Sequence, residues 1–140
     1  RSYRLGKKEG DGHLVPVCVD LTNPTPPLGW NHAERESLAA RGPCDVGLAL
    51  ALVHHLAISN NTPLGWIAEF FHGTCRELVV EWVPKEDPQV RRLLRSREDI
   101  FESYHREGFE AAFEPWFETL AERAVGDDGR VLFLMRARER

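Results

Sequence analysis

Residues Asp45 to Pro63 read DVGLALALVHHLAISNNTP, and the pattern of this stretch decides the fold class. Its first part, Val46 to Val53, is an uninterrupted apolar run that ends abruptly at a histidine pair, His54 and His55. A strand buried on both faces has this pattern, because helices cover both sides of a parallel sheet and the alternation of polar and apolar residues is lost. The Thr-Pro pair at 62–63 then supplies a helix cap and a first helical residue. The stretch therefore predicts a strand, a loop and a helix, which is half of a parallel β-α-β unit.

Strand patterns also lie on both sides of this stretch. The run HLVPVCV, His13 to Val19, predicts a short strand, and its internal proline favours an edge position. The run ELVVEWV, Glu77 to Val83, predicts a further buried strand. Near the C-terminus, Phe117 to Val125 and Arg130 to Ala137 are strand-like and are joined by GDDG at 126–129, which predicts an antiparallel hairpin.

Capping signals and apolar periodicity place helices between these strands. They predict helices over His32 to Ala40, Pro63 to Thr74 and Asp87 to Arg95, with a further helical stretch over Glu98 to His105. The aromatic side chains that recur at helical spacing from 109 to 117 are interpreted as core.

The order of these elements predicts an α/β fold, Rossmann-like, with a mostly parallel sheet that ends in an antiparallel hairpin. Residues 1–12 are polar and glycine-rich and are expected to form a flexible lead-in, whereas residues 13–140 form one domain.

The composition is that of an ordinary globular protein, with 42% hydrophobic and 29% charged residues and a net charge of −4. The overall charge gives no indication of nucleic-acid binding. Three cysteines without C-x-x-C spacing, and no apolar run long enough to cross a membrane, predict a cytoplasmic protein without a membrane partner. The six histidines show no metal-ligand spacing, so no metal site is expected.

Polar residues lie directly after each of the first three predicted strands. Because ligands bind beyond the carboxyl ends of parallel strands, these clusters predict a ligand cleft along one edge of the sheet. The clusters are Asp20, Thr22 and Asn23; His54 and His55; and Lys85, Glu86 and Asp87.

The segments VPVCVD at 15–20, DVGLALALVHHL at 45–56 and ELVVEWVPK at 77–85, followed by the hairpin, resemble the second half of class I S-adenosylmethionine-dependent methyltransferases. The combination of DLTNP...GW, ALALVHHLAI and VVEWVPKEDP is similar to a particular set of methyltransferase-like proteins. The resemblance covers nearly the whole chain from about His13. It implies the cofactor S-adenosylmethionine and a methyl-acceptor substrate that the sequence does not identify.

The resemblance also implies roles for individual residues. Asp20 stands where the family has an acid that accepts a hydrogen bond from the adenine amino group, and Leu21 would offer its backbone N–H to the same ring. Val53 and His54 would line the cofactor, and His54 or His55 would take a proton from the substrate. Each role has a structural alternative: Asp20 can hold its own turn, and neighbouring strand residues point to opposite faces, so one histidine is expected to pack internally.

The family's glycine-rich loop and the acid after its second strand have no counterpart in residues 1–12. We therefore expect this chain to act as a methyltransferase only together with an upstream half, and to bind cofactor weakly alone. The alternative is a non-catalytic interaction module on a degenerate methyltransferase scaffold. A further alternative is that two copies of the chain complete the sheet across a homodimer.

Overall fold

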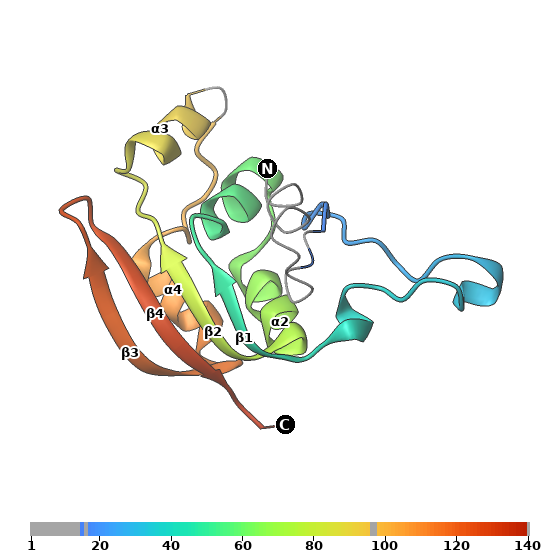
Figure 1. The fold of residues 1–140 in the computed structure, drawn as a ribbon. Coiled ribbons are helices and arrows are strands. Elements are labelled where there is room, and N and C mark those ends of the chain that lie inside the picture. Colours follow the sequence, from blue (N-terminus) through green and yellow to red (C-terminus); the bar gives the residue numbers. More distant parts are fainter. Residues whose placement is uncertain (1–14, 16, 96–97, 140) are drawn as a thin grey trace, which may run out of the picture.

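The computed structural model describes residues 15, 17–95 and 98–139, which are organised around an open four-stranded sheet (Figure 1). The strands are β1 (Cys44–Ala49), β2 (Cys75–Trp82), β3 (Phe117–Val125) and β4 (Arg130–Ala137), in the spatial order β1-β2-β4-β3. β1 and β2 are parallel, whereas β4 runs antiparallel to both of its neighbours. The predicted α/β class is confirmed, but the expectation of a mostly parallel sheet is wrong for the described residues.

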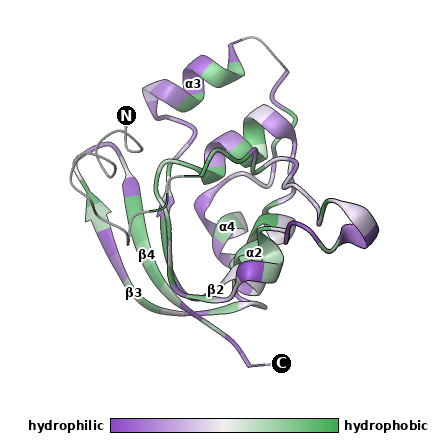
Figure 2. Ribbon diagram, turned by 45° about the vertical axis from the view of Figure 1, so that its right-hand side comes forward, coloured by the Kyte–Doolittle hydropathy of each residue, from purple (hydrophilic) through white to green (hydrophobic). Residues whose placement is uncertain are grey.

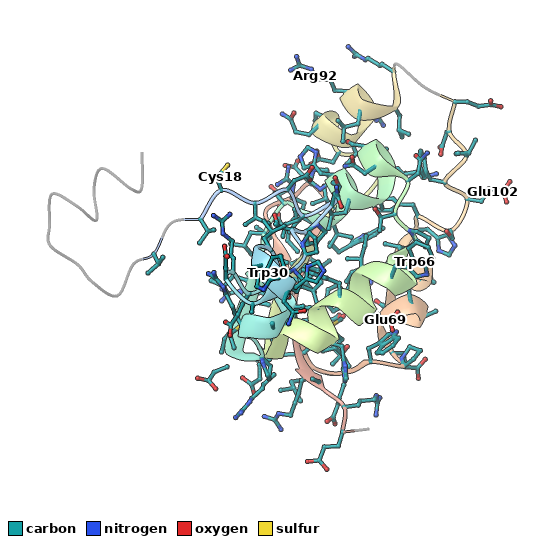
Figure 3. All side chains as sticks on the ribbon, turned by 90° about the vertical axis from the view of Figure 1, so that its right-hand side faces the viewer. Cys18, Trp30, Trp66, Glu69, Arg92 and Glu102 are labelled. Carbon is teal, nitrogen blue, oxygen red and sulfur yellow. The ribbon has the colours of Figure 1, made fainter. Side chains whose placement is uncertain are left out.

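The crossover between β1 and β2 contains two helical segments. A π-helix, η3 (His55–Ser59), follows β1, and α2 (Leu64–Thr74) precedes β2. The predicted helix over 63–74 is confirmed, although Pro63 itself occupies the cap position and no side chain caps the helix. Leu64, Ile67 and Phe71 form the buried stripe of α2, whereas Trp66 and Glu69 lie on its outer surface (Figure 3).

One face of the sheet is covered by α2 and α4 (Arg106–Phe113), which pack against each other (Figure 2). The core beneath them is aromatic, as the sequence predicts. The Phe109 ring lies 4.3 Å from Phe113, 5.3 Å from Trp82 and 5.3 Å from Phe133, measured between ring centroids. Burial of each large apolar side chain stabilises the fold by about 1.5–3 kcal/mol, so this cluster anchors the helical layer to β2 and β4.

The C-terminal hairpin and the helix after β2 are also confirmed. β3 and β4 have the predicted bounds, and the turn between them uses positive φ angles at Gly126 and Gly129. Helix α3 (Pro88–Leu94) begins at the predicted Asp-Pro pair, where Asp87 Oδ1 accepts the Gln89 N–H at 2.8 Å. Both elements are specified by short local sequence signals, which explains why they could be predicted.

β1 differs from the prediction in length and in burial. It ends at Ala49, and its side chains are largely exposed: 50% for Val46 and 69% for Leu48. The expected strand over 46–53, buried on both faces, is therefore wrong. The physical reason is that β1 is an edge strand among the described residues, and the sheet face opposite α2 has no helix on it there.

Three further predictions fail in the described part of the chain. The described residues of the predicted strand over 13–19 (15 and 17–19) form no strand, and Cys18 is exposed (Figure 3). The predicted helix over 32–40 is replaced by two short 3-10 turns, η1 (Trp30–His32) and η2 (Ala39–Arg41), because Asn31 has a φ of 53° and does not cap a helix. The stretch 98–105 is not helical. It is held instead by the Tyr104 hydroxyl, which donates to the Val83 carbonyl at 2.8 Å.

The predicted lead-in over 1–12 lies outside the described residues. Among the residues that are described, no helix is long and apolar enough to cross a membrane.

Candidate functional site

The candidate site lies at the carboxyl ends of β1 and β2, where the loops that follow these two parallel strands meet. The chain turns sharply after β1, and Ala51 at this turn has a φ of 49°, in the left-handed region. The Ala51 N–H donates to Oε2 of Glu81, near the end of β2, at 2.7 Å. This bond joins the end of β2 to the loop that carries the histidine pair.

His54 is buried behind this loop, with 3% of its surface exposed. Burial, together with the charges of His55 and Arg130, lowers the pKa of His54 to about 4, against the opposing effect of Asp87 and Glu81. Nδ1 of His54 is buried and has no hydrogen-bond partner. The imidazole is therefore neutral near pH 7 and is poorly suited to hold a transferred proton.

His55 begins the π-helix η3 and is exposed. Its ring lies 4.2 Å from the His54 ring, measured between centroids, and its carbonyl accepts a hydrogen bond from Asn60 Nδ2 at 2.9 Å. The expectation that one of the two histidines packs internally agrees with this arrangement. His55 is the member of the pair that a molecule in solution can reach.

An ion cluster of Glu81, Asp87 and Arg130 lies beside His54. Nη2 and Nε of Arg130 lie 2.8 and 2.9 Å from Oδ2 of Asp87, and Nη1 lies 3.2 Å from Oε1 of Glu81. The Asp87 side chain is 1% exposed and the Glu81 side chain 10%. Hydrogen bonds from the Gln89 N–H and from Arg130 hold the pKa of Asp87 below its usual value despite burial. One guanidinium and two backbone N–H groups thus supply hydrogen bonds to the two buried carboxylates.

Asp20 and Leu21 lie on a separate segment in front of β1. Oδ1 of Asp20 accepts hydrogen bonds from the Thr22 hydroxyl at 2.7 Å and from the Thr22 N–H at 2.9 Å, and both bonds lower the pKa of Asp20. Asp20 thus holds its own turn, which is the structural alternative considered for it, while its carboxylate remains exposed.

Leu21 lines an apolar groove of about 460 Å³ between this segment, β1 and α2. Leu48 and Leu52 line the same groove, as do Phe70, Phe71 and both Cys44 and Cys75. The groove runs along the open side of β1 and is bordered by the loop that leads to the histidine pair.

The structure brings together His54, His55 and Asp87 from two of the three predicted polar clusters. Val53 is fully buried beside them. The cluster containing Asp20 follows no strand within residues 15 and 17–19, so the described residues do not place it at the carboxyl edge of the sheet. Glu81 and Arg130 were not predicted. The signal for Glu81 is its position as a charged residue inside an otherwise apolar strand, since a buried charge requires a partner.

Comparison with known proteins yields one curated relative, Nodulation protein NoeA from Rhizobium meliloti (strain 1021). It is 35% identical over 127 residues, which make up 91% of this chain and 27% of the relative. The chain therefore spans about a quarter of the length of the relative. No protein-family model matches the chain. No solved structure matches it at a significant level.

Proposed function

We propose that this chain is the C-terminal portion of a class I S-adenosylmethionine-dependent methyltransferase, acting on a methyl acceptor that is not identified. The observation that carries the proposal is the strand order β1-β2-β4-β3, with one parallel pair followed by an antiparallel hairpin whose last strand lies next to β2. The second half of the family's sheet is built in this way. The name of the curated relative refers to nodulation and not to a chemical step, so the proposal depends on topology and on the site.

The described residues fit one end of such a cofactor. The apolar groove beside β1 offers a surface for the adenine ring at Leu21, and the exposed carboxylate of Asp20 lies next to it in sequence. The buried Nδ1 of His54 is a polar atom without a partner at the adjoining loop. The residues that hold the ribose and the methionine in the family have no counterpart among these, which supports the need for an upstream half.

The cofactor, when bound, supplies a methyl group on a positively charged sulfur. In this proposal the chain contributes position and proton transfer. His55 accepts the proton of the acceptor group, because it is exposed and follows β1. His54 packs behind it as a neutral side chain, and Val53 is buried beside it, so both support the loop that carries His55.

The exposed edge of β1 supports the requirement for additional strands. Val46 and Leu48 are half-exposed or more, and Leu50, just beyond the strand, is 54% exposed. Exposed apolar edges are rare in complete domains because they promote unwanted pairing. An upstream segment that adds a strand at this edge and packs on the sheet face opposite α2 would cover all three residues and bring the family's glycine-rich loop to the candidate site.

The second candidate function is a non-catalytic interaction module, and the same exposed face favours it. If no upstream half completes the sheet, the apolar surface around Leu48 is available to a partner protein. This alternative predicts that neither this chain nor an upstream-extended protein binds the cofactor, although both are folded.

Calorimetric titration of S-adenosylhomocysteine tests the proposal on two proteins: this chain, and the chain extended upstream in its reading frame. We expect binding only by the extended protein, and at least a tenfold weaker Kd for its Asp20→Ala variant. The matched control is Asp45→Ala, which removes an exposed carboxylate near the start of β1 that lies 3.9 Å from Arg76. Absence of binding by both lengths would refute the cofactor assignment and favour the interaction module.

A further inference from the structure

The Glu81 carboxylate contacts two segments that are remote from it in sequence. Oε2 accepts a hydrogen bond from the N–H of Ala51, which is 30 residues away in sequence. Oε1 accepts a hydrogen bond from Nη1 of Arg130, which is 49 residues away. The side chain is 10% exposed, so little water competes for these bonds. A charged acceptor in such surroundings forms stronger hydrogen bonds than a neutral one.

The backbone at Ala51 requires a contact of this kind. Its φ of 49° lies in the left-handed region, which the Cβ atom of an L-residue disfavours. Such a conformation persists only where the surroundings hold it, and the 2.7 Å bond to Glu81 does so at the residue concerned. The turn at Ala51 redirects the chain from β1 into the segment that carries His54 and His55.

Arg130 fixes the orientation of Glu81 in turn. Its guanidinium bonds twice to Oδ2 of Asp87, and Asp87 is itself fixed because its other oxygen caps α3 through Gln89. Arg130, the first residue of β4, therefore holds one oxygen of Glu81, and the other oxygen accepts the Ala51 N–H. The loop after β1 and the start of β4 thus meet at one carboxylate.

We infer that Glu81 is a positioning residue that sets the conformation of the loop after β1 through the Ala51 N–H, and that Arg130 orients Glu81 for this task. The use of this loop to place His55 rests on the proposed function. The conformational role itself depends only on the contacts of Glu81.

Amide hydrogen exchange of this chain, followed residue by residue with NMR, tests the inference. In Glu81→Gln the uncharged amide loses its ion pair with Arg130 and holds Ala51 less firmly. We expect the exchange rate of the Ala51 amide to rise at least tenfold relative to that of Val80, a buried residue of β2 that reports overall stability. The ratio of the Ala51 rate to the Val80 rate corrects for any loss of overall stability in the variant.

Glu77→Gln is the matched control. Glu77 also lies on β2 and bonds to an arginine of β4, since its Oε1 accepts Nη2 of Arg136 at 3.0 Å, but the pair is more exposed and lies at the opposite end of the strand. We expect the Ala51 to Val80 ratio to stay unchanged in this variant. An equal ratio in the wild type, Glu81→Gln and Glu77→Gln would overturn the inference.

A second measurement covers the case in which Glu81→Gln is poorly folded. Glycine adopts a φ of 49° without a Cβ penalty, so Ala51→Gly should reduce the dependence of the loop on Glu81. We expect Glu81→Gln to lower the urea midpoint clearly less in the Ala51→Gly background than in the wild type. The same loss in both backgrounds would contradict the inference. Neither readout involves the cofactor, so a failure to bind S-adenosylhomocysteine would refute the proposed function and leave this result intact.

Discussion

At the scale of single residues, the neighbours His54 and His55 occupy contrasting environments. His55 is exposed at the start of η3, whereas His54 is buried against the ion cluster of Glu81, Asp87 and Arg130. A sequence pattern indicates only that a histidine pair follows the strand. The difference between the two arises from the turn at Ala51 and from charges supplied by distant residues.

The lowered pKa of His54 predicts that the protein loses stability in mild acid. The unfolded chain binds a proton at the ordinary pKa of 6.5, but the folded protein resists protonation until about pH 4. The unfolded state therefore binds more protons between these values, and the free energy of unfolding should fall by about 1 kcal/mol for each pH unit as the pH decreases through this window. Urea unfolding at several pH values between 7.5 and 4.5 measures this slope.

The variant His54→Phe should flatten that slope, because it removes the titrating group while filling the buried space. His32→Gln serves as the control, since His32 is exposed and lies outside the core. If the wild type and His54→Phe lose stability equally with decreasing pH, the buried neutral imidazole is not the cause.

At the scale of elements, the turn of the β3–β4 hairpin shows how strongly local sequence can specify structure. Gly126 and Gly129 have φ angles of 63° and 73°, which glycine adopts readily. A Cβ at Gly126 would meet no atom within 4 Å, so the effect of a substitution there is conformational rather than steric.

We therefore expect Gly126→Ala to lower the free energy of unfolding by about 1 kcal/mol, the cost of a left-handed alanine. Gly73→Ala is the matched comparison. Gly73 lies in α2, also with no atom near its Cβ position, and there alanine should raise stability by about 0.5–1 kcal/mol. Thermal and urea unfolding of the two variants should thus shift in opposite directions. A shift in the same direction would contradict the conformational explanation.

Whether an element is specified by local or by distant residues explains which elements could be predicted. The hairpin, α3 and α2 depend on turn glycines, an Asp-Pro cap and apolar periodicity, all of which are local. The exposure of β1 depends on which strands lie beside it. Whether the predicted strand over 13–19 forms depends on whether a sheet edge is available for it to pair with. Neither property is encoded within the segment itself.

At the scale of the whole molecule, the two edges of the sheet are protected differently. The β3 edge carries charged residues such as Glu118, Glu122 and Arg123, which discourage pairing with another sheet. The β1 edge exposes Val46 and Leu48 and carries one charged residue, Asp45. A chain with one protected and one open edge is expected to associate through the open one.

We predict that this chain self-associates through β1 and that Leu48→Lys weakens the association at least tenfold. Leu48 is 69% exposed, so the substitution adds a charge to the edge without disturbing the core. Sedimentation over a range of concentrations measures the effect. Leu120→Lys on β3, where the leucine is 38% exposed, is the control and should leave association unchanged. Equal association of both variants and the wild type would exclude β1 as the contact.

The ion cluster also determines the order in which the site can form during synthesis. Ala51 and Glu81 leave the ribosome well before Arg130, which follows Glu81 by 49 residues. Until the first residue of β4 emerges, the Glu81 carboxylate lacks its guanidinium partner, and the loop after β1 lacks a fixed acceptor. The loop that carries the histidine pair is thus completed by a residue translated well after it, and a nascent chain halted before residue 130 would present β1, α2 and β2 without an ordered site.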